Sequence, residues 1–263
     1  MLFALKTSIV NALTFIFAML YFWFIFTIGH YWCTSDASRR NWMKGAHGLS
    51  FWVYLLRLVF HNRIVLLGPP IEAHGRLTVV NANHWHNLDG LILCTLLHNP
   101  VEISAVSTLH NTSSFDRKVL HMIDAITTEE PFLERAQTKI RGSTGGILLT
   151  FFEGVALNHS PKTWRKYLNR PKYLTFELLA QELPGAVFYD VDLVYTYKNR
   201  ALNPKDKWFL WRLMSGQTKI YVHTKRCTFP GPAEDPDRFL DDLYDEKWRH
   251  IQAILSSSAL KAE

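Results

Sequence analysis

A long run of apolar residues near the N-terminus dominates the hydrophobic pattern of this chain. Residues 7–35 contain no Asp, Glu, Lys or Arg, and residues 13–28 are almost wholly apolar. A helix over residues 8–29 would be about 33 Å long at ~1.5 Å per residue, and the hydrocarbon core of a bilayer is ~30 Å thick. Tyr and Trp residues gather towards its C-terminal end, as they do at a membrane interface. The pattern therefore predicts a membrane helix.

A cleaved signal peptide is the alternative interpretation of this run. Only Lys6 precedes it as a positive charge, the run is longer than the apolar region of a signal peptide, and no A-x-A cleavage site follows. A retained anchor is therefore favoured. Arg39, Arg40 and Lys44 follow the run, so the positive-inside tendency places the rest of the chain on the cytoplasmic side. The endoplasmic reticulum or another internal membrane is the candidate location.

A second apolar stretch covers residues 48–60 and carries one charge, Arg57. Because this stretch is too short to span a bilayer, it predicts a helix that lies in the interface. A core helix of the soluble domain is an equal alternative, and the two stretches could also form a hairpin that enters one leaflet and returns. We accordingly divide the chain into a membrane-anchoring segment, residues 1–62, and an α/β domain, residues 63–263.

Beyond residue 76 the pattern alternates short apolar strands with helices. Asp235 and Pro236 are typical of the N-cap and first position of the last helix. Strands separated by helices predict an α/β fold with a mostly parallel central sheet flanked by helices. The expected strands cover residues 76–81, 101–107, 125–128, 147–152, 186–197 and 218–224, and the expected helices cover 88–97, 115–123, 131–140, 173–182 and 236–256.

Composition narrows the class of protein. A hydrophobic share of 48% excludes a disordered chain, and an aromatic share of 14% fits a protein that meets lipid headgroups. The net charge, 29 − 23 = +6, suits a membrane or a phosphate-bearing ligand and is too small to indicate nucleic acid. Cys33, Cys94 and Cys227 are odd in number and form no CxxC pair, which argues against a disulfide framework and a zinc ribbon.

The first candidate site, residues 83–89, follows a predicted strand and precedes a predicted helix. Ligands of α/β sheets bind at the carboxyl ends of strands. His84 can take a proton from a hydroxyl, while Asp89 holds the imidazole in the required tautomer and stabilises its cation. No serine is needed if the attacking hydroxyl belongs to the substrate. A polar loop with a helix-capping Asp is the structural alternative.

The same residues also form an H-x-H-x-x-D pattern, whose spacing is similar to that of metal ligands. His84 and His86 would lie on the same side of an extended segment. Hydrolases of the metallo-β-lactamase type use H-x-H-x-D-H, whereas Asp89 comes one residue later here and Gly90 follows it. We therefore expect no metal at this site and keep a metal-dependent hydrolase only as a lesser alternative.

The second candidate site is Glu153-Gly154, directly after another predicted strand. The glycine permits a tight turn and close approach of the backbone to a ligand. From residue 139 to residue 172 there are seven Lys or Arg residues and one acid, Glu153. This bias predicts a cradle for a phosphate, and it is compatible with a basic face on anionic lipid.

Asn83-His84 with Asp89 resembles the N-H-x4-D motif of the glycerolipid acyltransferases, and Phe152-Glu153-Gly154 stands in place of their F/P-E-G-T motif. Residues 170–193 and 239–247 resemble the eukaryotic branch, which includes lysophosphatidic acid and lysocardiolipin acyltransferases. The resemblance covers roughly residues 76–250. It implies transfer of a fatty acyl group from acyl-CoA to a lysophospholipid hydroxyl, with His84 as general base, Asp89 as its orienting partner and no cofactor besides acyl-CoA as co-substrate.

The resemblance also assigns Glu153 and Gly154 to the acceptor-phosphate site, but the motif around them is altered. Val155 and Ala156 replace the Thr and the frequent Arg of the family, and residues 125–130 lack the Arg of its middle motif. A catalytically degenerate lipid-binding member is the alternative that these losses motivate. If the protein is active, we expect neighbouring basic residues to bind the phosphate in place of the lost groups. Lys139, Arg141 and Arg170 are favoured over Lys162 and Arg165.

Overall fold

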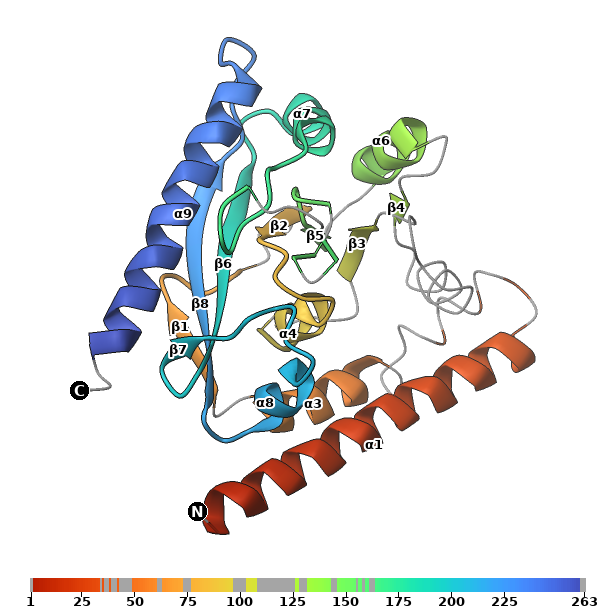
Figure 1. The fold of residues 1–263 in the computed structure, drawn as a ribbon. Helices are drawn as coiled ribbons and strands as arrows, with labels where there is room; N and C mark the ends of the chain where they lie inside the picture. Colours follow the sequence, from red (N-terminus) through yellow and green to blue (C-terminus); the bar gives the residue numbers. More distant parts are fainter. Residues whose placement is uncertain are drawn as a thin grey trace.

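The computed structural model confirms the α/β fold with a mostly parallel sheet flanked by helices (Figure 1). The parts of the chain that it describes are residues 2–33, 35, 38, 42, 49–60, 63–72, 77–96, 103–107, 126–127, 132–142, 146–154, 156–157, 159–160 and 164–260. The helix expected at residues 115–123 lies outside these described residues.

The strands form one sheet in the order β1-β8-β6-β2-β5-β3-β4, with β7 paired to β6. Pairing is parallel throughout except where β6 meets β8 and β7. The described central strands β2 and β5 are buried along their whole length, as parallel strands between two helical layers are. The strands are β1 (Ile64–Leu67), β2 (Thr78–Ala82), β3 (Ile103–Ser107), β4 (Ile126–Thr127), β5 (Ile147–Thr150), β6 (Val187–Tyr197), β7 (Arg200–Ala201) and β8 (Thr218–Thr228).

The last helix begins where its sequence signal predicted. Asp235 caps the last helix, because its Oδ1 accepts the backbone N–H of Asp237 at 3.0 Å. The pattern did not predict β1, β7 or α8, and it ended β8 four residues too early. The helices that come after β1 in the chain are α4 (Asp89–Leu96), α6 (Phe132–Gly142), α7 (Tyr173–Glu182), α8 (Phe209–Met214) and α9 (Pro236–Leu260).

Successive residues of β6 point to the two helical layers. Asp190 and Asp192 face α9, where both accept from the Lys247 ammonium. Tyr195 faces the opposite layer, where it bonds Asp89 at the start of α4 and its ring meets Phe209 of α8 at 5.6 Å. Figure 1 shows α9 running along β6 and β8, with α4 and α8 on the other side. Asp89 and α9 therefore lie on different faces of the sheet.

The second apolar stretch forms α3 (Leu49–Phe60), and its two faces have different surroundings. Val53 and Leu56 are buried in the same core as the central strands. Phe51, Tyr54 and Leu58 are exposed on the other face. The core-helix interpretation thus describes the buried face of α3, and the interfacial interpretation of its exposed apolar face stays a prediction.

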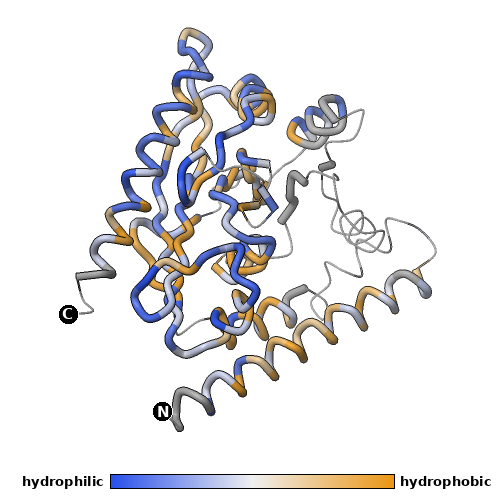
Figure 2. Tube along the Cα trace, in the orientation of Figure 1, coloured by the Kyte–Doolittle hydropathy of each residue, from blue (hydrophilic) through white to orange (hydrophobic). Residues whose placement is uncertain are grey.

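The N-terminal run forms α1 (Leu2–Trp32), and residues Lys6–Gly29 are long and apolar enough to cross a membrane. This helix lies against α3 and α8 rather than projecting away from them (Figures 1 and 2). Phe22 of α1 packs on Trp52 of α3 at 4.7 Å, and Asn11 donates to the backbone oxygen of Met214 at 3.3 Å. The division proposed at residue 62 falls between α3 and β1, yet α1, α3 and the sheet contribute to one core.

Candidate active site

The two candidate motifs meet at one edge of the sheet. β2 ends at Ala82 just before His84, and β5 ends at Thr150 just before Glu153. These two strands are parallel neighbours, with Asn81 opposite Thr150. Their carboxyl ends therefore lie side by side, where ligands of α/β sheets bind.

His84 and Asp89 form a hydrogen-bonded pair, with 3.2 Å between His84 Nδ1 and Asp89 Oδ2. The His84 side chain is 18% exposed, whereas that of Asp89 is fully buried. Asp89 Oδ2 also accepts the backbone N–H of His86 at 2.8 Å, so the carboxylate caps its loop as well. An Nδ1–H that donates to this carboxylate leaves Nε2 as the proton acceptor of the ring.

Tyr195 completes the surroundings of Asp89. Its hydroxyl donates to Asp89 Oδ1 from near the C-terminal end of β6. Burial raises the pKa of Tyr195 well above its ordinary value, so the hydroxyl remains a donor. The sequence pattern did not single this residue out, because nothing local distinguishes it from the other tyrosines of the same strand.

Two asparagines anchor the loop that carries His84. The Asn83 side chain donates to the backbone oxygen of Leu193 at 2.9 Å and accepts the Leu193 N–H at 2.6 Å. The Asn81 amide oxygen accepts the N–H of Phe152 at 3.1 Å, which joins the ends of β2 and β5. Both asparagines are buried, so these bonds hold the loop to its neighbouring strands.

Glu153 is buried and turned towards the backbone. Its Oε1 accepts the N–H of His84 at 3.0 Å, and its Oε2 accepts the N–H of Asn169 at 2.9 Å. Burial raises the pKa of Glu153 to about 8, although the two backbone N–H groups oppose that shift. Glu153 therefore positions the backbone of His84. Because both of its oxygens already accept backbone N–H groups, an acceptor phosphate would contact the residues around Glu153 instead.

Gly154 has a left-handed backbone, with φ +70°, and Lys172 lies directly beside it. A Cβ at position 154 would be 2.9 Å from Lys172 Nζ. The Lys172 N–H donates to the oxygen of Phe152 at 2.7 Å, which keeps the two segments together. In the sequence, Lys172 is the last of the seven basic residues between positions 139 and 172, and nothing singled it out. In the folded chain its ammonium lies beside Gly154 of the second motif.

Among the basic residues favoured from the sequence, those whose side chains the structure describes contact other groups of the chain. Both ends of the Arg141 guanidinium bind Glu182 of α7 at 2.7 Å, and the Arg141 side chain is 66% exposed. Arg170 lies 3.5 Å from the hydroxyl of Tyr173. Lys139 belongs to α6, but its side chain is outside the described part, as is Lys162, and Arg165 pairs with Asp245 of α9.

The two histidines of the H-x-H pattern have separate surroundings. The His84 ring stacks on Phe151 at 4.1 Å, and the His86 ring stacks on Phe209 at 4.2 Å. Burial lowers the pKa of His86, which keeps that ring neutral near pH 7. This arrangement favours an acid–base pair, His84 with Asp89, over a shared metal site.

Comparison with known proteins identifies the fold. The structure matches the 1-acyl-sn-glycerophosphate (LPA) acyltransferase PlsC from Thermotoga maritima with a TM-score of 0.50, over 96% of this chain and 98% of that one. The chain has the fold of a glycerolipid acyltransferase. The two sequences are 15% identical, so the likeness is one of fold. No protein-family profile matches the sequence. No curated protein matches it either.

Proposed function

We propose that this protein is a membrane-associated acyltransferase that moves a fatty acyl group from acyl-CoA to the hydroxyl of a lysophospholipid. The observation that carries the proposal is the pairing of His84 with buried Asp89 at the carboxyl end of β2, in a chain with the glycerolipid acyltransferase fold. The acceptor class includes lysophosphatidic acid and related glycerophospholipids.

In the proposed reaction, His84 Nε2 takes the proton of the acceptor hydroxyl as its oxygen attacks the thioester carbonyl carbon. A carbon–oxygen bond forms and the carbon–sulfur bond breaks. The CoA thiolate leaves and takes the proton back from the imidazolium. Asp89 holds the Nδ1–H and stabilises the transient cation, and the Tyr195 hydroxyl shares in fixing that carboxylate. We propose that acyl-CoA is the co-substrate and that the step needs no further cofactor.

The acceptor phosphate is proposed to bind over Gly154, and Lys172, which lies beside this glycine, is proposed as its cation. A glycine has no side chain and so permits close approach of a ligand to the backbone, and the neighbouring ammonium adds a charge-assisted bond. This assignment keeps Gly154 from the sequence prediction and transfers the role of Glu153 to positioning. Arg141 serves the contact with Glu182 instead.

Three neighbouring helices, α1, α3 and α8, carry exposed apolar side chains, which we call the membrane face. Such a surface is consistent with a lipid acceptor that reaches the protein from a bilayer. Trp208 and Trp211 of the α8 region are 55% and 53% exposed, and the Lys207 ammonium lies over the Trp208 ring. Aromatic rings flanked by cations suit the headgroup region of an anionic leaflet. Figure 2 shows that α1, the longest of these helices, is predominantly hydrophobic. A cytoplasmic orientation stays a prediction.

The test is a matrix of lysophospholipids against acyl-CoA chain lengths, read as release of CoA thiol and formation of the acylated lipid. We expect transfer with at least one pair. The variant His84→Ala should lose about 10²–10⁴-fold in turnover, and Asp89→Asn somewhat less.

The circular dichroism spectrum and vesicle binding of both variants serve as controls for folding. If no pair supports transfer, the degenerate lipid-binding alternative is correct. If His84→Ala turns over like the unmodified protein, the proposed base is wrong.

A further inference from the structure

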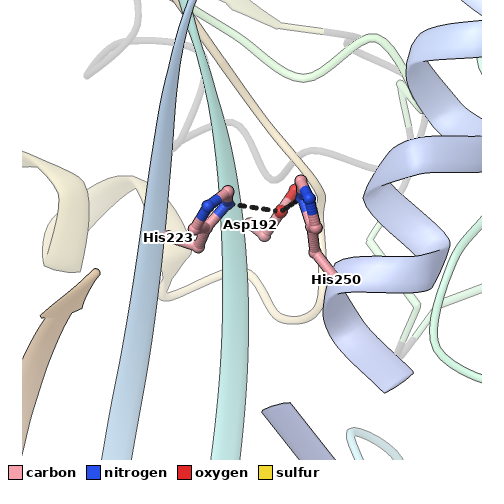
Figure 3. A group of neighbouring side chains, drawn as sticks. All are labelled: Asp192, His223 and His250. Atoms are coloured by element: carbon pink, nitrogen blue, oxygen red, sulfur yellow. Dashed lines mark hydrogen bonds and ion pairs between the residues drawn. The ribbon is translucent and has the colours of Figure 1, made fainter. Parts of the chain in front are cut away.

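A second cluster of titratable side chains lies on the opposite face of the sheet from His84. Asp192 of β6, His223 of β8 and His250 of α9 converge there (Figure 3). His223 Nδ1 lies 3.0 Å and His250 Nδ1 3.2 Å from the same oxygen, Asp192 Oδ2. One potential ligand atom from each residue lies within 4.8 Å of the others.

We propose that Asp192, His223 and His250 form a binding site for a divalent transition metal of the Zn²⁺ class. Two imidazole nitrogens and one carboxylate oxygen are a donor set that zinc favours. Ligands at ~2.0–2.2 Å in a tetrahedral arrangement lie about 3.4 Å from one another. The two separations between Asp192 and the imidazoles are already close to that value, so binding needs only small side-chain movements.

The groups around the cluster are those that commonly support a metal site. Lys247 Nζ donates to Asp192 Oδ1 at 2.8 Å, which orients the carboxylate and leaves Oδ2 towards the imidazoles. Glu246 Oε1 lies 3.7 Å from His250 Nε2. A carboxylate near the second ring nitrogen is the usual outer partner of a metal-bound histidine. The cluster therefore has supporting groups on two of its three ligands.

Burial and charge also suit a cation. The Asp192 side chain is 2% exposed, whereas those of His223 and His250 are 25% and 33% exposed. The metal would thus have a buried anionic ligand and a route from solvent, with water as the fourth ligand. Lys247 shares one positive charge between two carboxylates, Asp190 and Asp192.

The position of the cluster indicates a structural role. Its three ligands come from two antiparallel strands and the C-terminal helix, so a bound metal would tie α9 to the sheet. His84 and Asp89 lie on the other face and take no part in it. The test of the site therefore uses metal binding and stability and does not rely on activity.

The experiment uses the full chain in detergent, first stripped with a chelator and then titrated with Co²⁺ and Zn²⁺. Co²⁺ absorption in the visible range reports tetrahedral coordination, and metal analysis after dialysis against Zn²⁺ reports stoichiometry. We expect about one metal per chain and a melting temperature that rises by several degrees with Zn²⁺, because a ligand of the folded state stabilises it.

The decisive variant is the double substitution His223→Gln with His250→Gln, which keeps amide donors for Asp192 while removing both imidazoles. It should fold without metal but lose the Co²⁺ spectrum and the Zn²⁺ response. Cys227→Ser is the matched control, since it removes a soft donor from the same strand outside the cluster and should bind as the unmodified protein does. Equal binding by the double variant, or no stoichiometric binding by the unmodified chain, would overturn the proposal.

Discussion

The backbone N–H of His84 donates a 3.0 Å hydrogen bond to the buried carboxylate of Glu153. The two residues are 69 positions apart in sequence, and each belongs to a different motif. The other Glu153 oxygen holds the N–H of Asn169. The second motif thereby fixes the loop that carries the proposed base, and the two motifs act as one structural unit.

Glu153→Gln should lower turnover more than it raises the acceptor KM. A glutamine side chain has one acceptor oxygen, so one of the two backbone N–H groups, on His84 or Asn169, loses its partner. The expected loss of stability is about 1–3 kcal/mol. Chemical denaturation and steady-state kinetics measure both effects. Glu182→Gln, at the surface pair with Arg141, is the control. A change confined to the acceptor KM would instead support direct contact of Glu153 with the acceptor.

Glu153 should also make stability depend on pH. Its pKa is about 8 in the folded protein and near 4.5 in an unfolded chain. Between those values the folded state binds more protons, so its contribution to stability is complete below pH 4.5 and is lost as the pH rises through 8. Melting temperatures measured from pH 5 to 8 should fall, and Glu153→Gln should flatten that slope. An unchanged slope in the variant would assign the pH dependence to other groups.

Tyr195→Phe should reduce turnover roughly tenfold or more while the acceptor KM changes little. The substitution removes the hydroxyl that donates to Asp89 Oδ1, and hydrogen bonds to charged groups contribute about 1.5–3 kcal/mol. Because Asp89 then holds His84 less firmly, the pH profile of turnover should shift as well. Tyr197→Phe, two residues further along the same strand, should behave like the unmodified protein. Equal losses in both variants would point to general damage to β6.

Lys172→Met should raise the acceptor KM about tenfold or more with little effect on the KM for acyl-CoA. The reason is the loss of a charge-assisted bond, which contributes about 1.5–3 kcal/mol. Arg141→Gln is the informative comparison, because its guanidinium is committed to Glu182 and should not affect either KM. If Arg141→Gln raises the acceptor KM and Lys172→Met does not, the phosphate binds at the residues favoured from the sequence.

Replacing Trp208 and Trp211 together by Ser should weaken binding to anionic vesicles by at least roughly tenfold. Removing an aromatic side chain from an apolar environment costs about 1.5–3 kcal/mol, and both rings are exposed on the membrane face. Vesicle co-sedimentation measures the effect at fixed salt. Trp164→Ser is the control, since that ring is packed under the Arg165 guanidinium at 4.0 Å. Equal losses in both variants would remove α8 from the membrane face.

Local pattern was enough to predict the main elements. The helix over residues 173–182 matches α7 residue for residue, and Asp235 caps α9 as its position suggested. His84 and Asp89 were found because a strand end, a short polar loop and a helix start lie together within a few residues. The short helix α8 was missed, since six residues are too few for a periodic pattern to stand out.

What the sequence by itself determined is therefore local: the apolar N-terminal helix, the alternation of strands and helices, and the His84 loop with its neighbouring acid. The tertiary structure alone decided which distant groups surround that loop. Tyr195 reaches Asp89 across 106 residues because β6 lies next to β2, and Lys172 rather than Arg141 comes to lie beside Gly154. Such contacts depend on strand order and register, which arise from burial of the whole sheet between two layers of helices and leave no mark on the spacing of residues along the chain.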